Sequence, residues 1–235
     1  MKSIEDTCFL VVAKSNSERT PGKMYKEFCD SSLLEIAINK LIKSKKIPNR
    51  QICISVHGDQ LIEIANKYKD IVRVHIRDDS SVQENSKISE IYQVVGVLRD
   101  SHFVEINACC PLLQISTIER FVDKFISSQS AALFGVIGNR TFYWDKDMNP
   151  LKECSTALET KRANIIYEAA HTLYAGSCDD LKDNIHMGSF TKLGDPELYV
   201  IDDHMQCWDI DYPWQFVAAE ELYKRSMKGY INGGI

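Results

Sequence analysis

The chain has 235 residues, of which 44% are hydrophobic and 26% are charged, and its formal net charge is −5 at pH 7. This composition is typical of a globular protein with one well-filled core, so we expect a single domain over residues 1–235. The negative net charge argues against binding to nucleic acid, and no apolar run is long enough to span a membrane. The first residues do not resemble a signal peptide, so we expect a cytoplasmic protein.

The eight cysteines are scattered along the chain, without a CxxC pair or a histidine spacing typical of zinc. Cys8 and Cys53 fall within predicted strands, where a thiol behaves as a small hydrophobic group. Free thiols used in this way are typical of the reducing cytosol. Cys109 and Cys110 are adjacent, but without a nearby base or a resolving partner we do not expect a redox pair.

Apolar runs of strand length alternate with helical patterns along the first 137 residues. Ser32 with Glu35 and Ser116 with Glu119 have the spacing of a capping box, which marks a helix start. Such alternation predicts a mostly parallel sheet with helices on both faces, an α/β fold of three layers. The predicted strands are residues 8–13, 52–56, 71–76, 103–106 and 131–137, and the predicted helices are residues 32–41, 60–68, 86–98 and 116–127.

Residues 138–192 break this rhythm with an aromatic run, a turn-like segment and two further pieces of strand character. The aromatic run is residues 141–144, and the strand-like pieces are residues 165–167 and 171–174. An aromatic excursion from a regular fold is typical of a surface that packs on a second subunit, so we expect an inserted arm that forms a homodimer. The alternative is an extra hairpin that covers the core of its own subunit.

Two carboxylates, Asp209 and Asp211, lie one residue apart near the C-terminus. In an extended backbone both side chains point to one face, while Ile210 turns into the core. Such a pair suits Mg²⁺, which takes one or two protein carboxylates and completes its shell with water and phosphate oxygens. The alternative is that both are solvated, or offset a helix dipole. We also expect Asp211 to lack a buried partner, so that its substitution leaves stability nearly unchanged.

A final helix is predicted to follow these carboxylates, because Pro213 fits the first turn of a helix. Its apolar positions would be Trp214, Phe216, Val217, Ala218 and Leu222.

A loop of small, polar and basic residues follows the first predicted strand, from Lys14 to Lys23. At the carboxyl end of that strand, backbone N–H groups and the heads of Lys14, Arg19 and Lys23 can face a polyphosphate. The glycines of a Walker A loop and of a GxGxxG fingerprint are absent, which argues against a P-loop enzyme and against a Rossmann or flavodoxin-like redox protein. The alternative is a solvated basic loop.

These segments resemble the CMP-sugar-acid synthetases, which are the acylneuraminate and 3-deoxy-manno-octulosonate cytidylyltransferases. The run Ala13-Lys14-x-x-Ser17-x-Arg19-x-Pro21-Gly22-Lys23 resembles their nucleotide loop. Asp209-Ile210-Asp211, followed by Phe216 and Ala219-Glu220, resembles the metal motif of the acylneuraminate branch. Val56-x-x-Asp59, Arg77 and Asn107-x-x-x-Pro111-Leu112 stand at matching places between them, so the resemblance covers nearly the whole chain.

The resemblance implies a three-layer α/β/α nucleotidyltransferase fold. It also implies transfer of a cytidylyl group from CTP to a 2-keto-3-deoxy sugar acid similar to sialic acid, with release of pyrophosphate. Asp211 would bind Mg²⁺ directly, Asp209 directly or through water, and Asp211, Arg19 and Lys23 would be catalytic. The nucleotide would be bound by Val12, Ala13, Lys14, Ser17, Arg19, Lys23 and Arg77. Asn107 would contact the acceptor, Lys161 or Arg162 would meet its carboxylate, and the arm would close over the partner's site.

The sequence departs from this family pattern near the expected sites. Lys14 replaces an arginine, Met24 stands where an asparagine is common, and Cys109 and Cys110 replace a threonine–serine pair. Ala169-Ala170-His171 stands where the family has Asn-Gly-Ala. Two alternatives therefore stay open: transfer to another acidic acceptor, such as a phosphonate or a nonulosonate other than sialic acid, and a catalytically silent nucleotide-binding protein. An acceptor panel and pyrophosphate release from CTP would distinguish them.

Overall fold

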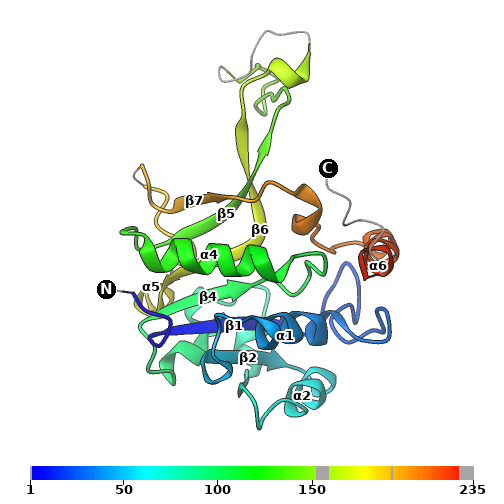
Figure 1. The fold of residues 1–235 in the computed structure, drawn as a ribbon, viewed down its shortest axis with the longest axis vertical. Helices are drawn as coiled ribbons and strands as arrows, with labels where there is room; N and C mark the ends of the chain where they lie inside the picture. Colours follow the sequence, from blue (N-terminus) through cyan, green and yellow to red (C-terminus); the bar gives the residue numbers. More distant parts are fainter. Residues whose placement is uncertain (1, 152–158, 192, 228–235) are drawn as a thin grey trace.

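The computed structural model describes residues 2–151, 159–191 and 193–227, and within these residues seven strands form one sheet (Figure 1). The strand order is β3-β2-β1-β4-β6-β5-β7. Strands β1 to β4 run parallel to one another, β7 runs parallel to β5, and β6 is antiparallel to both β4 and β5. The expected mostly parallel sheet is therefore confirmed. The strands are β1 (Thr7–Lys14), β2 (Ile52–His57), β3 (Arg73–Ile76), β4 (His102–Ile106), β5 (Leu133–Asn139), β6 (Ile166–Ser177) and β7 (Glu197–Val200).

Helices cover both faces of this sheet, because successive residues of its strands are buried on opposite sides. Phe9 of β1 belongs to a core cluster that includes buried residues of α1 (Leu33–Lys43), α2 (Asp59–Asn66), α4 (Ile115–Ser127) and α6 (Pro213–Met227). Leu10 packs on the other face, with residues of α5 (Cys178–Lys182) and of the segment that holds α3 (Ile88–Ile91). The short 3-10 segments are η1 (Asn49–Gln51), η2 (Asp79–Val82), η3 (Gln93–Gly96), η4 (Thr160–Arg162) and η5 (His204–Cys207). None of the described helices is long and apolar enough to cross a bilayer.

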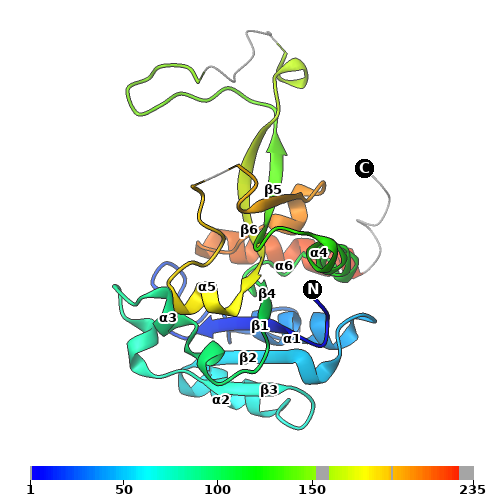
Figure 2. The same ribbon diagram turned by 90° about the vertical axis from the view of Figure 1, so that its left-hand side faces the viewer.

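The excursion predicted over residues 138–192 divides into two parts. The two strand-like pieces belong to the single strand β6, whose C-terminal half lies in the sheet between β4 and β5. Only the outer ends of β5 and β6, with residues 140–151 and 159–165, project from the sheet (Figures 1 and 2). We call this projecting hairpin the arm. Residues 152–158 and 192 of the predicted excursion lie outside the described residues.

The helix predicted over residues 86–98 is interrupted. It forms only α3 and the 3-10 segment η3, which meet at Tyr92, where φ is −102° and ψ is 30°. The Tyr92 hydroxyl donates to Glu105 Oε2 at 2.7 Å inside the core. This buried contact fixes the tyrosine, and the β-branched residues and glycine that follow it favour a helix poorly. The hydrophobic periodicity therefore predicted which side of this segment is buried, but it did not predict the interruption of the helix at Tyr92.

The two predicted capping boxes have different outcomes. Ser32 Oγ accepts from Glu35 N at 3.2 Å and caps α1 as expected. Helix α4 instead begins after Gln114, and Ser116 does not cap it. The Glu119 carboxylate accepts from Ser44 Oγ and Lys45 N, both at 2.8 Å, at the end of α1. Glu119 therefore joins two helices, and the capping box predicted for α4 is wrong.

We predict that Ser32→Ala lowers the free energy of unfolding by about 1 kcal/mol, because it leaves a backbone N–H of α1 without its cap. Ser116→Ala is the matched control, and its effect should stay within about 0.5 kcal/mol, as for an exposed surface site. Urea denaturation of both variants measures the difference. Equal losses would contradict the assignment of Ser32 as the cap.

Candidate active site

A cavity of about 340 Å³ opens beside the loop that follows β1. The strand order reverses between β1 and β4, and in open α/β sheets ligands bind outside the carboxyl ends of strands at such a point. We call it the loop cavity. Of the seven residues expected to bind a nucleotide, all except Arg77 line it, and Asp211 lines it as well. The complete lining is Val12, Ala13, Lys14, Asn16, Ser17, Glu18, Arg19, Thr20, Lys23, Met24, Cys109 and Asp211.

The loop is fixed to its neighbours at its start. Ser15 N donates to His57 O at 3.1 Å, which continues the pairing of β1 with β2. Gly58 has a φ of +100°, and a Cβ there would lie 2.1 Å from Ser15 Oγ, so only glycine fits. Arg77 is buried behind the loop and donates to Ala13 O at 3.4 Å and to Ser81 O at 2.7 Å. Arg77 therefore supports the end of β1. It does not line the loop cavity, although we expected it to bind the nucleotide there.

The loop also holds the segment that carries Asp211, through contacts that we call the Asp211 clamp. Arg19 Nη1 lies 2.8 Å from Asp211 Oδ2, and Lys23 Nζ lies 3.4 Å from Asp211 Oδ1. Lys23 Nζ also donates to Ile210 O, and Thr20 Oγ1 donates to Asp211 O at 2.7 Å. Lys23 is only 9% exposed. Asp211 thus has a buried cationic partner, which corrects the expectation that it has none.

The backbone of residues 208–211 has no strand partner, although Ile210 is fully buried as expected. Ile210 N donates to Cys109 O at 3.0 Å. Gln215 Oε1 accepts from both Asp211 N and Tyr212 N, each at 2.8 Å, and so caps the start of α6. The sequence signal for this contact was a glutamine at the third helical position, the place from which a side chain reaches back to the cap.

Helix α6 begins at Pro213 as predicted, but its buried side differs from the prediction. Trp214 is 63% exposed and Val217 is 67% exposed, whereas Phe216 and Ala219 are buried. The helix therefore packs through a narrow stripe, with positions three residues apart, and its predicted apolar face was too wide.

Asp209 occupies a different environment from Asp211. Burial and the neighbouring charge of Asp211 raise the pKa of the Asp209 carboxyl. Its Oδ1 atom is buried and has no hydrogen-bond partner. The described residues contain no group of three or more His, Cys, Asp or Glu side chains suited to a metal ion. A pair of carboxylates with one unpaired oxygen instead fits Mg²⁺, which needs few protein ligands when phosphate oxygens complete its shell.

A second cavity, of about 440 Å³, also has Asp211 in its lining. We call it the Trp208 cavity. Trp208 and Trp214 meet edge to face in its wall, with ring centroids 6.3 Å apart. Among the described residues its lining contains no lysine or arginine. The lining is Ile137, Glu168, Ala169, Ala170, His171, His204, Cys207, Trp208, Asp209, Asp211, Trp214 and Gln215.

The three residues expected to contact the acceptor do not line either of these cavities. Asn107 Nδ2 donates to His171 O at 2.7 Å, and its Oδ1 accepts from Cys109 N at 2.9 Å. Lys161 and Arg162 lie in η4 on the arm, where both pair with Glu159. The structure therefore gives Asn107 a supporting position, and it does not bring the two basic residues to the cavities of their own chain.

Two of the departures from the family pattern touch each other. Met24 and Cys109 both line the loop cavity, and their sulfur atoms are 3.7 Å apart. Burial raises the pKa of the Cys109 thiol to about 11, so the thiol is protonated at neutral pH. The two side chains therefore form a contact between soft, polarisable sulfur atoms in the wall of the loop cavity. The seven described cysteines are free.

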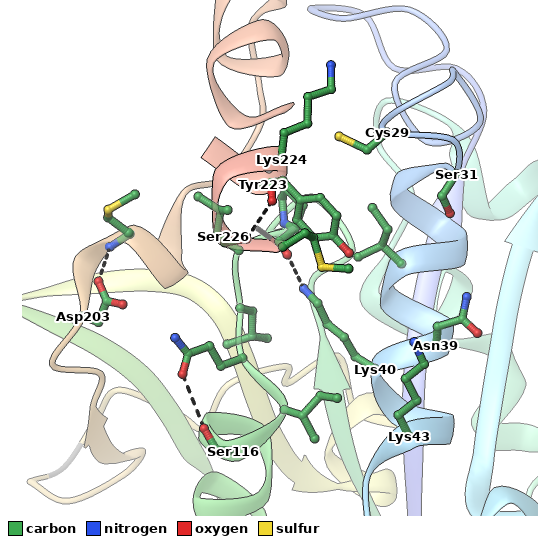
Figure 3. A pocket seen from close by; sticks show the side chains of 18 of the residues that line it. Cys29, Ser31, Asn39, Lys40, Lys43, Ser116, Asp203, Tyr223, Lys224 and Ser226 are labelled. Carbon is green, nitrogen blue, oxygen red and sulfur yellow. Dashed lines mark hydrogen bonds between the residues drawn. The ribbon is translucent and has the colours of Figure 1, made fainter. Parts of the chain in front are cut away.

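A third cavity, of about 850 Å³, lies between α1, the segment after β4 and the end of α6 (Figure 3). None of the predicted site residues lines it. Lys40, in its wall, donates from Nζ to Cys110 O at 3.1 Å and to Pro111 O at 2.6 Å. Lys40 therefore supports, from behind, the backbone next to Cys109.

We predict that substitution of the two carboxylates has different effects on the free energy of unfolding. Asp211→Asn should lower the free energy of unfolding by about 1–3 kcal/mol, because it leaves buried Lys23 without its charged partner. Asp209→Asn should leave stability unchanged or raise it at pH 7, since a carboxylate whose folded-state pKa is raised destabilises the fold once it is ionised. Denaturation without nucleotide or metal measures both. A loss for Asp209→Asn as large as that for Asp211→Asn would contradict this difference.

Comparison with known proteins gives a consistent result. Residues 8–226 match the family model described as cytidylyltransferase. Two pseudaminic acid cytidylyltransferases of Campylobacter jejuni subsp. jejuni are similar to the chain, one from serotype O:23/36 (strain 81-176) and one from serotype O:2. The identities are 25% over 132 residues and 24% over 131 residues. Each match covers 53% of this chain and 55% of the relative, so the chain spans about half the length of the curated relatives it matches.

Solved structures with a similar fold cover almost the whole chain. A CMP:2-keto-3-deoxy-manno-octonic acid synthetase complexed with CTP has a TM-score of 0.65 at 8% identity and covers 94% of this chain and 99% of its own. A 4-diphosphocytidyl-2C-methyl-D-erythritol synthase from Anaerococcus prevotii has a TM-score of 0.60 at 11% identity, with coverages of 94% and 98%. At these identities the likeness establishes the fold, which is the expected three-layer nucleotidyltransferase fold.

Proposed function

Because the chain belongs to the cytidylyltransferase family, we propose that it transfers the cytidylyl group of CTP to a small acidic acceptor and releases pyrophosphate. The main support is that Asp211 lines both the loop cavity and the Trp208 cavity. The first cavity carries the cationic side chains that suit a triphosphate, and the second does not. Nucleotide and acceptor would thus approach one carboxylate from two sides, which is the positioning that group transfer requires.

In the proposed reaction, an acceptor hydroxyl oxygen forms a bond to the α-phosphorus of CTP. The bond from that phosphorus to the oxygen bridging the α- and β-phosphates breaks, pyrophosphate leaves, and the hydroxyl proton passes to water. Asp211, with Asp209, would hold Mg²⁺, which when bound neutralises charge on the phosphate oxygens. Arg19 and Lys23, which pair with Asp211 in the structure, would hold the phosphates of the departing group.

We propose a 2-keto-3-deoxy sugar acid, of the nonulosonate type, as the acceptor. The curated relatives are named for pseudaminic acid, and one structural neighbour is named for 2-keto-3-deoxy-manno-octonic acid. The volume of the Trp208 cavity, about 440 Å³, is within the usual range for small-molecule sites. Its described lining has no lysine or arginine, which favours a singly charged carboxylate over a phosphonate.

We predict that the protein binds CTP more tightly than ATP or GTP, because a small pocket beside the backbone at Val12 and Ala13 would exclude a purine. With Mg²⁺ and a nonulosonate it should release pyrophosphate from CTP. Asp211→Asn should lower this rate by on the order of a hundredfold, comparable to the loss of one major electrostatic contact. Calorimetry with four nucleoside triphosphates and a coupled pyrophosphate assay measure these effects.

Two results would overturn this proposal. One is equal or tighter binding of a purine triphosphate, which would remove the cytidylyl assignment. The other is a near-normal rate for Asp211→Asn, which would make that carboxylate structural. CTP binding without pyrophosphate release, over a panel that includes sugar acids and phosphonates, would instead favour the silent nucleotide-binding protein.

We also propose that the arm forms a homodimer and covers the acceptor site of the second subunit. Its support is the set of exposed apolar residues on the arm, among them Trp144 at 56% and Tyr167 at 50% exposure. This arrangement would give Lys161 or Arg162 of one subunit a route to the acceptor carboxylate bound by the other.

We predict a dimer by light scattering at micromolar concentration. Trp144→Glu should shift it toward monomer, because the substitution places a charge in the patch that the dimer would bury. Val97→Glu is the control, since Val97 is 72% exposed and lies outside the arm. A wild-type protein that is monomeric at this concentration would remove the proposal.

A further inference from the structure

Strand β6 contains an irregularity where it passes the Trp208 cavity. On one side of it Tyr174 pairs with Phe134, and on the other side Ala169 pairs with Val136, with a shift in register between them. His171 lies within this shift and has a φ of +49°. Residues other than glycine seldom adopt this left-handed backbone conformation. Such bulges re-aim a side chain, and they are common next to active sites.

The surrounding structure holds this conformation in place. Asn107 Nδ2 donates to His171 O at 2.7 Å, and Asn107 N donates to Thr172 O at 3.0 Å. Thr172 Oγ1 donates to Ala170 O at 2.8 Å. An unfavourable backbone conformation persists only when its neighbours fix it in this way, and such positions cluster at functional sites.

The ring of His171 is held at one of its two nitrogen atoms. Its Nδ1 lies 3.3 Å from the Tyr174 hydroxyl, in a hydrogen bond that fixes the orientation of the ring. The other nitrogen, Nε2, is the one that can bond to a ligand. The exposed His171 ring thus offers Nε2 to the cavity that it lines.

We propose that His171 determines acceptor specificity, by donating a hydrogen bond from Nε2 to a carboxylate oxygen of the acceptor in the Trp208 cavity. This inference rests on the proposed function. That lining holds three carboxylates, Glu168, Asp209 and Asp211, and no lysine or arginine among the described residues. Ionised carboxylates cannot donate a hydrogen bond, so an acceptor carboxylate in the cavity needs another donor, and the His171 ring, which the bulge and Tyr174 hold in place, can supply one from Nε2.

The test uses His171→Gly, because glycine accepts a φ of +49° and removes only the imidazole. We expect the KM and the Kd for the sugar acid to rise about tenfold or more, as for a lost hydrogen bond to a charged group, with the KM for CTP unchanged. His171→Gln, which keeps an N–H donor, should recover part of the loss. Tyr174→Phe should raise the same KM severalfold, because it removes the hydrogen bond that holds the imidazole ring in place.

The matched control is Asp30→Gly, which relieves a φ of +61° at an exposed turn outside both cavities and should leave both KM values unchanged. A sugar-acid Kd for His171→Gly within twofold of wild type overturns the inference. Equal rises in the KM for CTP and for the acceptor overturn it too, because they indicate general distortion. Acceptor binding by calorimetry without pyrophosphate release would overturn the proposed function alone. No binding of any sugar acid by wild type overturns both.

Discussion

The ammonium group of Lys23 connects the loop after β1 to the segment that carries Asp209 and Asp211, although 187 residues separate it from Ile210. That segment has no strand partner, so its backbone position depends on side chains. Lys23 and Thr20 donate hydrogen bonds to its carbonyl oxygens, and the side-chain oxygen of Gln215 accepts from the amide of Asp211. Every other feature of the site depends on this connection, because it brings a loop and a helix start from opposite ends of the chain to a common boundary.

That boundary separates two cavities whose linings differ in charge. On one side Asp211 faces Arg19 and Lys23, so opposite charges compensate one another before any ligand arrives. On the other side Asp209 is half-buried beside an aromatic wall, in a lining whose described residues include no lysine or arginine. The contact between the sulfur atoms of Met24 and Cys109 lines the first cavity, while Lys40 supports the same backbone from behind.

The elements that sequence reasoning found are those whose signal is local. The strand before the loop, the Ser32 cap, Pro213 at a helix start and six of the residues that line the loop cavity were predictable, because periodicity and residue type determine them. The partners of Glu119 and the contact of buried Arg77 with Ala13 depend on tertiary contacts far along the chain. The placement of β6 between β4 and β5 was missed for the same reason. Its two strand-like pieces are separated by a bulge that interrupts their pattern.

Strand β6 has one further consequence. Its C-terminal half is bonded on both sides within the sheet, whereas its outer half pairs only with β5, and the bulge at His171 lies between the two. A two-stranded ribbon is more easily bent than a central strand. We therefore expect the width of the Trp208 cavity to follow the angle at which the arm leaves the sheet. The size of the molecule that fits would then be set partly by residues that never touch it.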